Sequence, residues 1–291
     1  MNGVLVVDKP KGITSFDVVR EVRRALKPKG PTRGGSPEMK VGHTGTLDPM
    51  ATGVLPICVG DATKIAQFII EATKAYDATL KLGVTTDTLD ADGKVVATRV
   101  VPEINREVLE NALAKFRGTI QQVPPMYSAI KIGGKRLYEL ARAGEEVERQ
   151  PREVTVFELV LRDFTADEVK FSVRSSKGFF VRSLAADLGE ALGCGAHLTA
   201  LRRTQSGPFT LAQSVPLTEI GSAKLVSLSD ALKDVPELKL SAVEAGRVKH
   251  GGLVEVPASL TGVHRVIDPS GALLAVAEAV KGRLVYRRVL V

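Results

Sequence analysis

The sequence contains no tryptophan and very little cysteine. Its two cysteines, Cys58 and Cys194, lie in unrelated contexts and suggest no disulfide framework, which fits a reducing compartment. No apolar run approaches the roughly 20 residues of a membrane-spanning helix. Residues 1–11 lack the apolar core of a signal peptide. We therefore expect a soluble, cytoplasmic protein that has no membrane partner.

Several motifs of cofactor-dependent enzymes are also missing. The sequence has no HExxH, no CxxC and no cluster of histidine and cysteine, so we expect no metal. It has no GxxxxGK[ST] loop for ATP, no GxGxxG after a strand and no GxSxG turn. An enzyme built on this sequence would need no cofactor and would work with its side chains alone.

The composition allows a packed core and favours an acidic partner. Hydrophobic residues make up 44% and charged residues 25% of the 291 residues, and the formal net charge is +7. Residues 9–40 hold nine lysines and arginines against three acids, so this stretch alone carries +6. A basic balance of this kind favours a polyanion such as nucleic acid. Aromatic residues reach only 4%, so base stacking would depend on a few side chains.

Hydrophobic periodicity predicts alternating strands and helices. The expected strands are residues 4–7, 54–59, 76–82, 127–132, 154–161 and 168–174, the last two forming a hairpin. The expected helices are residues 14–27, 61–70, 105–116 and 180–192, with another that ends at Gly144. After Val235 the pattern changes to short β-like runs. We therefore expect two domains, residues 1–235 and a small all-β appendage of residues 236–291.

The first expected helix carries a basic face. Arg20, Arg23, Arg24 and Lys27 recur at helical spacing, opposite a face of valines. This pattern alone indicates a solvated surface. The Gly- and Pro-rich basic loop of residues 29–40 follows it.

Residues 42–56 are unusual because they place three glycines, two prolines, His43 and Asp48 between apolar segments. Glycines allow close approach to another molecule, and Pro49 pushes Asp48 toward an extended conformation. By itself an aspartate before proline is usually a turn residue, and His43 would be a satisfied loop histidine.

The sequence of residues 42–56 strongly resembles the catalytic motif of the TruB family of tRNA pseudouridine synthases. Further motifs resemble the family in order, at residues 8–15, 74–76, 82–90, 124–131, 134–142, 176–182, 187–189 and 197–203. The resemblance covers roughly residues 3–210. It implies an α+β fold, in which helices flank a mixed, largely antiparallel sheet, and conversion of uridine 55 in the T-loop of tRNA to pseudouridine.

The resemblance makes Asp48 the catalytic aspartate. A carboxylate could attack C1′ of the ribose as a nucleophile, or act as a base at C2′ to give a glycal-like intermediate, and the sequence does not choose between them. Either role needs an ionised carboxylate in a dry pocket, where burial would raise its pKa. We expect Arg182 to pair with Asp48 and keep it charged.

The resemblance also assigns the residues around the target base. Tyr76 would stack on the uracil, Leu201 would form a wall of its pocket, and His43 would lie where the flipped base leaves the stack. Phe180 departs from the family, which often has tyrosine there, so a hydroxyl contact is missing. From periodicity alone, Tyr76 and Leu201 are ordinary core residues.

The expected partner is the T-arm of tRNA. Phosphates would be met by the basic helix face and by Lys131, Lys135 and Arg136, and the C-terminal region loosely resembles a PUA-type RNA-binding domain. We expect a monomer that needs no guide RNA. Two other functions stay open: an RNA-binding protein without catalysis, and a guide-RNA-dependent enzyme acting on ribosomal RNA.

Overall fold

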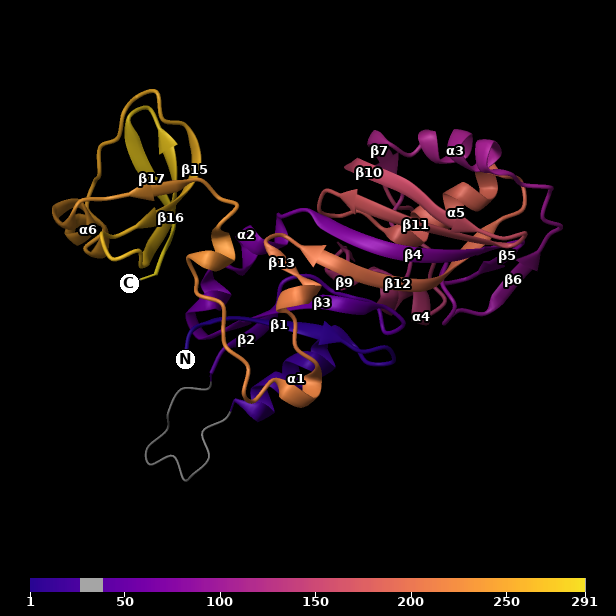
Figure 1. Cartoon of the computed structure of the whole chain (residues 1–291), viewed down its shortest axis with the longest axis horizontal. Coiled ribbons are helices and arrows are strands. Elements are labelled where there is room, and N and C mark those ends of the chain that lie inside the picture. Colours follow the sequence, from indigo (N-terminus) through magenta and orange to yellow (C-terminus); the bar gives the residue numbers. More distant parts are fainter. Residues whose placement is uncertain (27–38, 291) are drawn as a thin grey trace.

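The computed structural model describes residues 1–26 and 39–290, and within them one large sheet of nine strands dominates (Figure 1). Its path is β1-β3-β12-β4-β11-β10-β7, while β2 pairs with β3 and β13 with β12. The strands are β1 Gly3–Lys9, β2 Val41–His43, β3 Thr52–Val59, β4 Lys74–Leu82, β7 Gly118–Gln122, β10 Arg152–Phe164, β11 Glu168–Ser175, β12 Ala196–Ser206 and β13 Phe209–Thr210. All neighbours are antiparallel except β3 and β12. The expected mixed, largely antiparallel sheet flanked by helices is confirmed.

Two helices cover one face of this sheet. They are α3 Arg106–Ala114 and α5 Val181–Ala191. Leu109 and Leu184 are fully buried against strand residues such as Leu80 and Phe171 (Figure 1). Burying side chains of this size stabilises the layer by about 1.5–3 kcal/mol each. The helices α2 Ala66–Ile70 and α4 Leu137–Arg142 are short.

The basic helix exists as expected. Helix α1 spans Ser15–Ala25, and Thr14 caps it through a reciprocal pair of hydrogen bonds with Asp17. Its valines are buried, whereas Arg20 and Arg24 are exposed and Arg23 is half-buried. Lys27 lies outside the described residues.

A close contact joins the strands that carry the site. The parallel pairing of β3 and β12 places Gly53 opposite Arg203. Gly53 has φ +103°, and a Cβ there would lie 2.2 Å from the backbone oxygen of Arg203. Only glycine fits this conformation and this spacing.

The C-terminal region forms a four-stranded sheet of its own, with β14 Glu237–Lys239, β15 Gly262–Ile267, β16 Leu273–Val280 and β17 Arg283–Val289. The expected all-β character is wrong, because helix α6 Ala242–Lys249 packs on this sheet. Ser241 and Glu244 form a capping box at its start, a signal present in the sequence. The unit stands to one side of the large sheet (Figure 1). Val276 of β16 belongs to the same buried hydrophobic cluster as Val4 and Val54 of the large sheet.

Three other sequence expectations fail. Residues 61–70 form the 3₁₀ helix Gly60–Lys64 and then α2 rather than one helix. Residues 127–132 are mostly loop, and only β8 Lys131–Ile132 pairs with β9 Lys135–Arg136. Residues 85–93, expected as a turn-rich acidic loop, begin with the end of strand β5 Val84–Thr86, which pairs with β6 Val95–Thr98. Three short 3₁₀ helices complete the chain, at Leu211–Gln213, Leu217–Glu219 and Asp230–Leu232. Among the helices of residues 1–26 and 39–290, none is long and apolar enough to cross a bilayer.

Candidate active site

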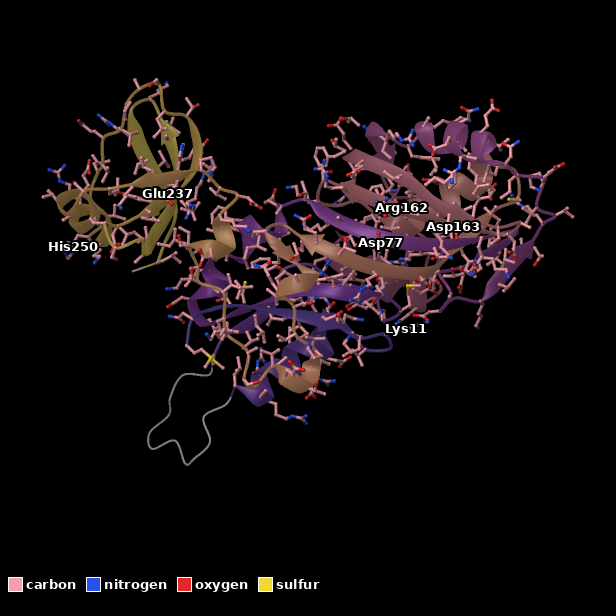
Figure 2. All side chains as sticks on the ribbon, viewed as in Figure 1. Lys11, Asp77, Arg162, Asp163, Glu237 and His250 are labelled. Carbon is pink, nitrogen blue, oxygen red and sulfur yellow. The ribbon has the colours of Figure 1, made fainter. Side chains whose placement is uncertain are left out.

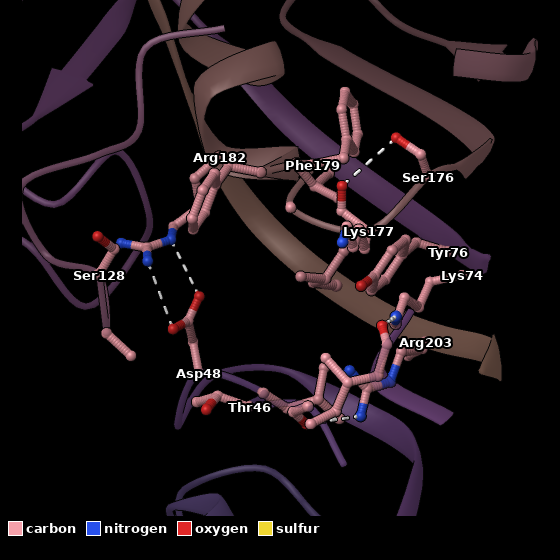
Figure 3. Close-up of a pocket in the computed structure, with 18 of the residues that line it drawn as sticks. Thr46, Asp48, Lys74, Tyr76, Ser128, Ser176, Lys177, Phe179, Arg182 and Arg203 are labelled. Carbon is pink, nitrogen blue, oxygen red and sulfur yellow. Dashed lines mark hydrogen bonds and ion pairs between the residues drawn. The ribbon is translucent and has the colours of Figure 1, made fainter. Parts of the chain in front are cut away.

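A cavity of about 360 Å³ lies where β4, β12, the start of α5 and the loop before β3 meet. It is lined by residues 44–48, 70, 74, 76, 128–130, 176–182, 201 and 203. Five of the six residues expected around the target nucleotide line it: Asp48, Tyr76, Phe180, Arg182 and Leu201. Asp48 and Arg182 face each other at one end, and Tyr76 lies toward the other (Figure 3).

The expected ion pair between Asp48 and Arg182 is present. Arg182 Nε lies 3.0 Å from Asp48 Oδ2, and Nη2 donates to Oδ1 at 3.4 Å. This side-on, two-point contact fixes both the position and the plane of the carboxylate. The side chain of Asp48 is 32% exposed and that of Arg182 only 5%, so the carboxylate opens to the cavity over a buried cation.

Arg182 is itself held from three directions. Its Nη1 donates to Thr88 O at 2.9 Å, and its Nη2 donates to Tyr127 O at 2.6 Å. Asp90, which is buried, lies 3.5 Å from Nη1. These contacts explain why residues 127–130 do not extend as a strand: the Tyr127 carbonyl binds the guanidinium instead.

The charge state of Asp48 reflects opposing influences. Burial raises the pKa of its carboxyl, Arg182 lowers it, and Asp90 raises it again, with a net upward direction. Lys9 also lowers the pKa of Asp48. Arg182 therefore offsets only part of the burial cost.

Lys9 supports the loop that carries Asp48. This lysine is fully buried, and its Nζ donates to Pro10 O at 3.0 Å, Pro49 O at 3.2 Å and Ala51 O at 2.7 Å. Burial lowers the pKa of Lys9 to about 8, although the negative charge of Asp48 acts to raise it. The sequence motif contained this lysine, but its backbone contacts depend on the fold.

Two buried cations lie near Tyr76. Arg203, 1% exposed, donates to Val54 O at 2.7 Å and Gly45 O at 3.1 Å. Burial lowers the pKa of the Arg203 guanidinium, whereas Tyr76 and Asp48 raise this pKa. Lys74, 8% exposed, donates from Nζ to Ile70 O and to Ala72 O. Sequence reasoning assigned neither residue a role.

Phe180 lies at the cavity, directly before α5. Its ring is partly buried, and its backbone is held by Gln122, a buried residue at the end of β7. Strand β7 was not expected, so nothing in the sequence pointed to Gln122.

His43 does not line the cavity. It ends β2, and its Nδ1 accepts a hydrogen bond from Gly45 N at 3.4 Å. Burial lowers its pKa and Arg203 lowers it further, so the neutral imidazole is favoured. The imidazole therefore lies beside the loop of Asp48 rather than inside the cavity.

The residues expected to meet phosphates fall into two groups. Lys131, Lys135 and Arg136 are exposed on the β8–β9 hairpin, which directly follows three cavity residues. On α1, Arg20 and Arg24 already pair with Asp17 and Glu21. Arg23 donates to Val41 O at 3.3 Å.

A second hollow, of about 640 Å³, lies over the other face of β4 and β11 and includes Asp77 and Arg162 (Figure 2). Its charges are satisfied locally, because Ser172 bridges Asp77 and Arg162 while Arg202 pairs with Asp8. We assign it no role. Within the described residues, no group of three or more His, Cys, Asp or Glu could hold a metal ion.

Comparisons with known proteins point to one family. The family model "TruB family pseudouridylate synthase (N terminal domain)" matches residues 33–181. The model "tRNA pseudouridylate synthase B C-terminal domain" matches residues 182–239. The chain is 45% identical over 298 residues to "tRNA pseudouridine synthase B" of Dechloromonas aromatica (strain RCB), covering 100% of this chain and 96% of that protein. It is 43% identical over 296 residues to the protein of the same name from Francisella philomiragia, covering 99% and 94%.

Solved structures support the fold. The "Crystal Structure of a Cbf5-Nop10-Gar1 Complex" gives a TM-score of 0.76 at 23% identity, covering 99% of this chain and 85% of that one. A structure of an H/ACA RNP bound to a substrate RNA gives a TM-score of 0.75 at 22% identity, with coverage of 99% and 85%. At this identity the likeness concerns the fold alone. The two family models and the extent of identity with full-length relatives show that the chain belongs to the TruB family of pseudouridine synthases.

Proposed function

We propose that this chain converts uridine 55 in the T-loop of tRNA to pseudouridine, with Asp48 as the catalytic residue. The observation that carries the proposal is the Asp48–Arg182 pair at one end of the cavity. Relatives named tRNA pseudouridine synthase B, at 43–45% identity over nearly the whole chain, support tRNA as the substrate.

The reaction breaks the C1′–N1 bond of the uridine and joins C1′ to C5 of the same uracil. Asp48 either attacks C1′ as a nucleophile or removes the proton at C2′. Both roles need the carboxylate in its ionised form, and the two-point contact with Arg182 favours that form and its orientation.

The remaining cavity residues fit a flipped uracil. Tyr76 and Leu201 lie on neighbouring strands and would hold the ring between them, while Phe180 packs at the side of the cavity. Flipping costs a few kcal/mol, which contacts with the extruded base must offset. His43, outside the cavity, would fill the space that the base leaves in the stack.

RNA would be bound over a wide basic surface. Lys131, Lys135 and Arg136 of the hairpin lie beside the cavity, Arg20, Arg23 and Arg24 lie on α1, and Lys27 follows them in the sequence. RNA loops expose unstacked bases, which suits a loop uridine as target. Residues 236–291 would act as a PUA-like domain that grips the acceptor-stem side. We propose a cytoplasmic monomer that acts without a guide RNA, metal or cofactor.

Incubation of the purified protein with an unmodified tRNA transcript, followed by mapping of pseudouridine, tests this function. We expect product at the T-loop uridine without added guide RNA or metal, and none with Asp48→Asn. Binding without product would favour an RNA-binding protein that lacks catalysis. Product only on addition of a guide RNA would favour the guide-dependent alternative.

A further inference from the structure

The charges buried around the cavity do not balance. Lys9, Lys74, Arg182 and Arg203 are all between 0% and 8% exposed. Within the described residues, the carboxylates at ion-pair distance from any of these four cations are Asp48 and Asp90, and both are engaged by Arg182. A buried cation is costly unless a negative charge is close to it. The protein therefore keeps an excess of positive charge at this site.

The excess lies at the Tyr76 end of the cavity. Within residues 1–26 and 39–290, no carboxylate lies at ion-pair distance from Lys74 or Arg203. Backbone carbonyls accept from both cations, and the carbonyls carry only partial charges. An ammonium has three donors, and Lys74 uses two of them on carbonyls. Figure 3 shows Lys74, Tyr76 and Arg203 together, away from the Asp48–Arg182 pair.

The strands place these cations around the base-binding residues. Arg203 on β12 is the direct cross-strand partner of Tyr76 on β4. Lys74 precedes Tyr76 by two residues and Arg203 follows Leu201 by two, so each cation shares a sheet face with a proposed uracil contact. The positive charge is therefore next to the ring rather than next to the ribose.

We propose that Lys74 and Arg203 stabilise the negative charge of the uracil ring while it is detached from the sugar, an inference that rests on the proposed function. When C1′–N1 breaks, its electron pair stays on N1 and spreads over O2 and O4. Asp48 meanwhile either bonds to C1′ or takes the C2′ proton. When C5 bonds to C1′, the pair is used in the new bond and the ring becomes neutral, while the Asp48–C1′ bond breaks or the proton returns to C2′. The C5 proton then leaves, and N1 takes up a proton. Preorganised charge aimed at such an anion lowers the barrier to the step that forms it.

The test uses Lys74, because Arg203 also holds the backbone of Gly45 and Val54. Lys74→Met removes the charge and keeps the length of the side chain, and Lys74→Arg keeps the charge. Lys81→Met, on the outer face of the same strand, is the matched control. The measurements are the single-turnover rate with saturating protein and unmodified tRNA transcript, and the tRNA dissociation constant at several salt concentrations.

We expect Lys74→Met to lower the single-turnover rate about 10²-fold, with the dissociation constant and its salt dependence unchanged. The single-turnover rate of Lys74→Arg should stay within tenfold of the wild-type rate, and the rate of Lys81→Met should equal the wild-type rate. A loss of less than tenfold in Lys74→Met overturns the proposal. If Lys74→Met instead weakens tRNA binding and reduces the salt dependence of that binding, Lys74 contacts a backbone phosphodiester and the proposal is wrong. Absence of product from the wild-type protein would contradict the proposed function itself, whereas an active wild type with an unaffected variant contradicts only this inference.

The pH dependence gives a readout that a structural role would not move. Burial lowers the pKa of Lys74 to about 8, with Arg203 and Lys177 lowering it further and Glu71 opposing them. The ammonium is present below this pKa and is lost as the pH rises through it, so the wild-type rate should fall above about pH 8. Lys9 has a similar pKa and contributes in every variant. Because Lys9 still titrates there, the fall should become smaller in Lys74→Arg, which keeps the charge at position 74. Identical profiles overturn the proposal even if Lys74→Met does not fold.

Discussion

The side-chain amide of Gln122 binds both backbone polar groups of Phe180. Gln122 Oε1 accepts from Phe180 N at 2.7 Å, and Nε2 donates to Phe180 O at 3.0 Å. Phe180 directly precedes α5, and Arg182 lies in the first turn of that helix. A residue at the far edge of the sheet thereby fixes the start of the helix that positions the catalytic arginine.

We expect Gln122→Ala to lower the free energy of unfolding by about 1–3 kcal/mol, because it leaves a buried donor without its partner. It should also slow pseudouridine formation, since Arg182 would be held less firmly. Urea unfolding and single-turnover assays measure the two effects. Gln121→Ala, an exposed neighbour on the same strand, is the control. Equal stability in the two variants would show that the Gln122 amide does not hold Phe180.

Arg182→Lys should lower the single-turnover rate about 10²-fold or more. A lysine keeps the charge but cannot contact both Asp48 oxygens and the carbonyls of Thr88 and Tyr127 together. tRNA binding, measured by titration, should change little. Near-wild-type turnover would show that the two-point geometry is not needed.

Activity should be lost on the acid side at a higher pH than an ordinary aspartate would give. The pKa of Asp48 is raised, chiefly by burial, and the ionised form is lost as the pH falls through it. An unperturbed aspartate has a pKa of about 3.9. Lys9→Met should move the loss to still higher pH, because Lys9 lowers the pKa of Asp48. Single-turnover rates across pH, with stability checked at each point, measure this. An unshifted acid limb in Lys9→Met would contradict the electrostatic link.

RNA binding should depend more on the hairpin than on α1. Lys135→Ala should reduce the slope of log K against log salt by about 1 if the lysine contacts a phosphate. Arg24→Ala should change it less, since Glu21 already pairs with Arg24. Binding titrations at several salt concentrations measure both slopes. A flat salt response in the wild type would remove the proposed phosphate contacts altogether.

Gly53→Ala should destabilise the protein by about 2–4 kcal/mol, combining backbone strain with a clash against Arg203. Gly12→Ala is the matched control, since Gly12 also has a positive φ of +91° but open space around it. It should cost only about 1–2 kcal/mol. Thermal and urea unfolding compare the two. Equal losses would show that the contact with Arg203 can relax.

Local signals predicted much of the fold. The first helix, the strand of residues 76–82 and the hairpin of β10 and β11 all appear as expected. Strand β12 was not expected, because its eleven residues mix threonine, arginine and glutamine with apolar residues, and its pairing on both sides determines its conformation. Helix α6 was missed although its capping box was visible.

Some features of the candidate site could likewise be predicted from the sequence, and others could not. The Asp48–Arg182 pair could be expected from the motifs that carry it, which lie 134 residues apart. The role of Gln122 and the backbone contacts of Lys9 and Arg203 could not be expected. Every residue has a main-chain carbonyl, so the sequence does not show which carbonyls accept these hydrogen bonds. His43 lies outside the cavity, and its expected place where the flipped base leaves the stack stays a prediction.

The buried cluster that holds Val4 of the first strand also holds Val276, from one of the last strands of the chain. During synthesis on the ribosome, this cluster would stay incomplete until more than 270 residues had been translated. A premature stop before β16 would therefore leave the part of the cluster that Val276 covers open to aggregation or proteolysis.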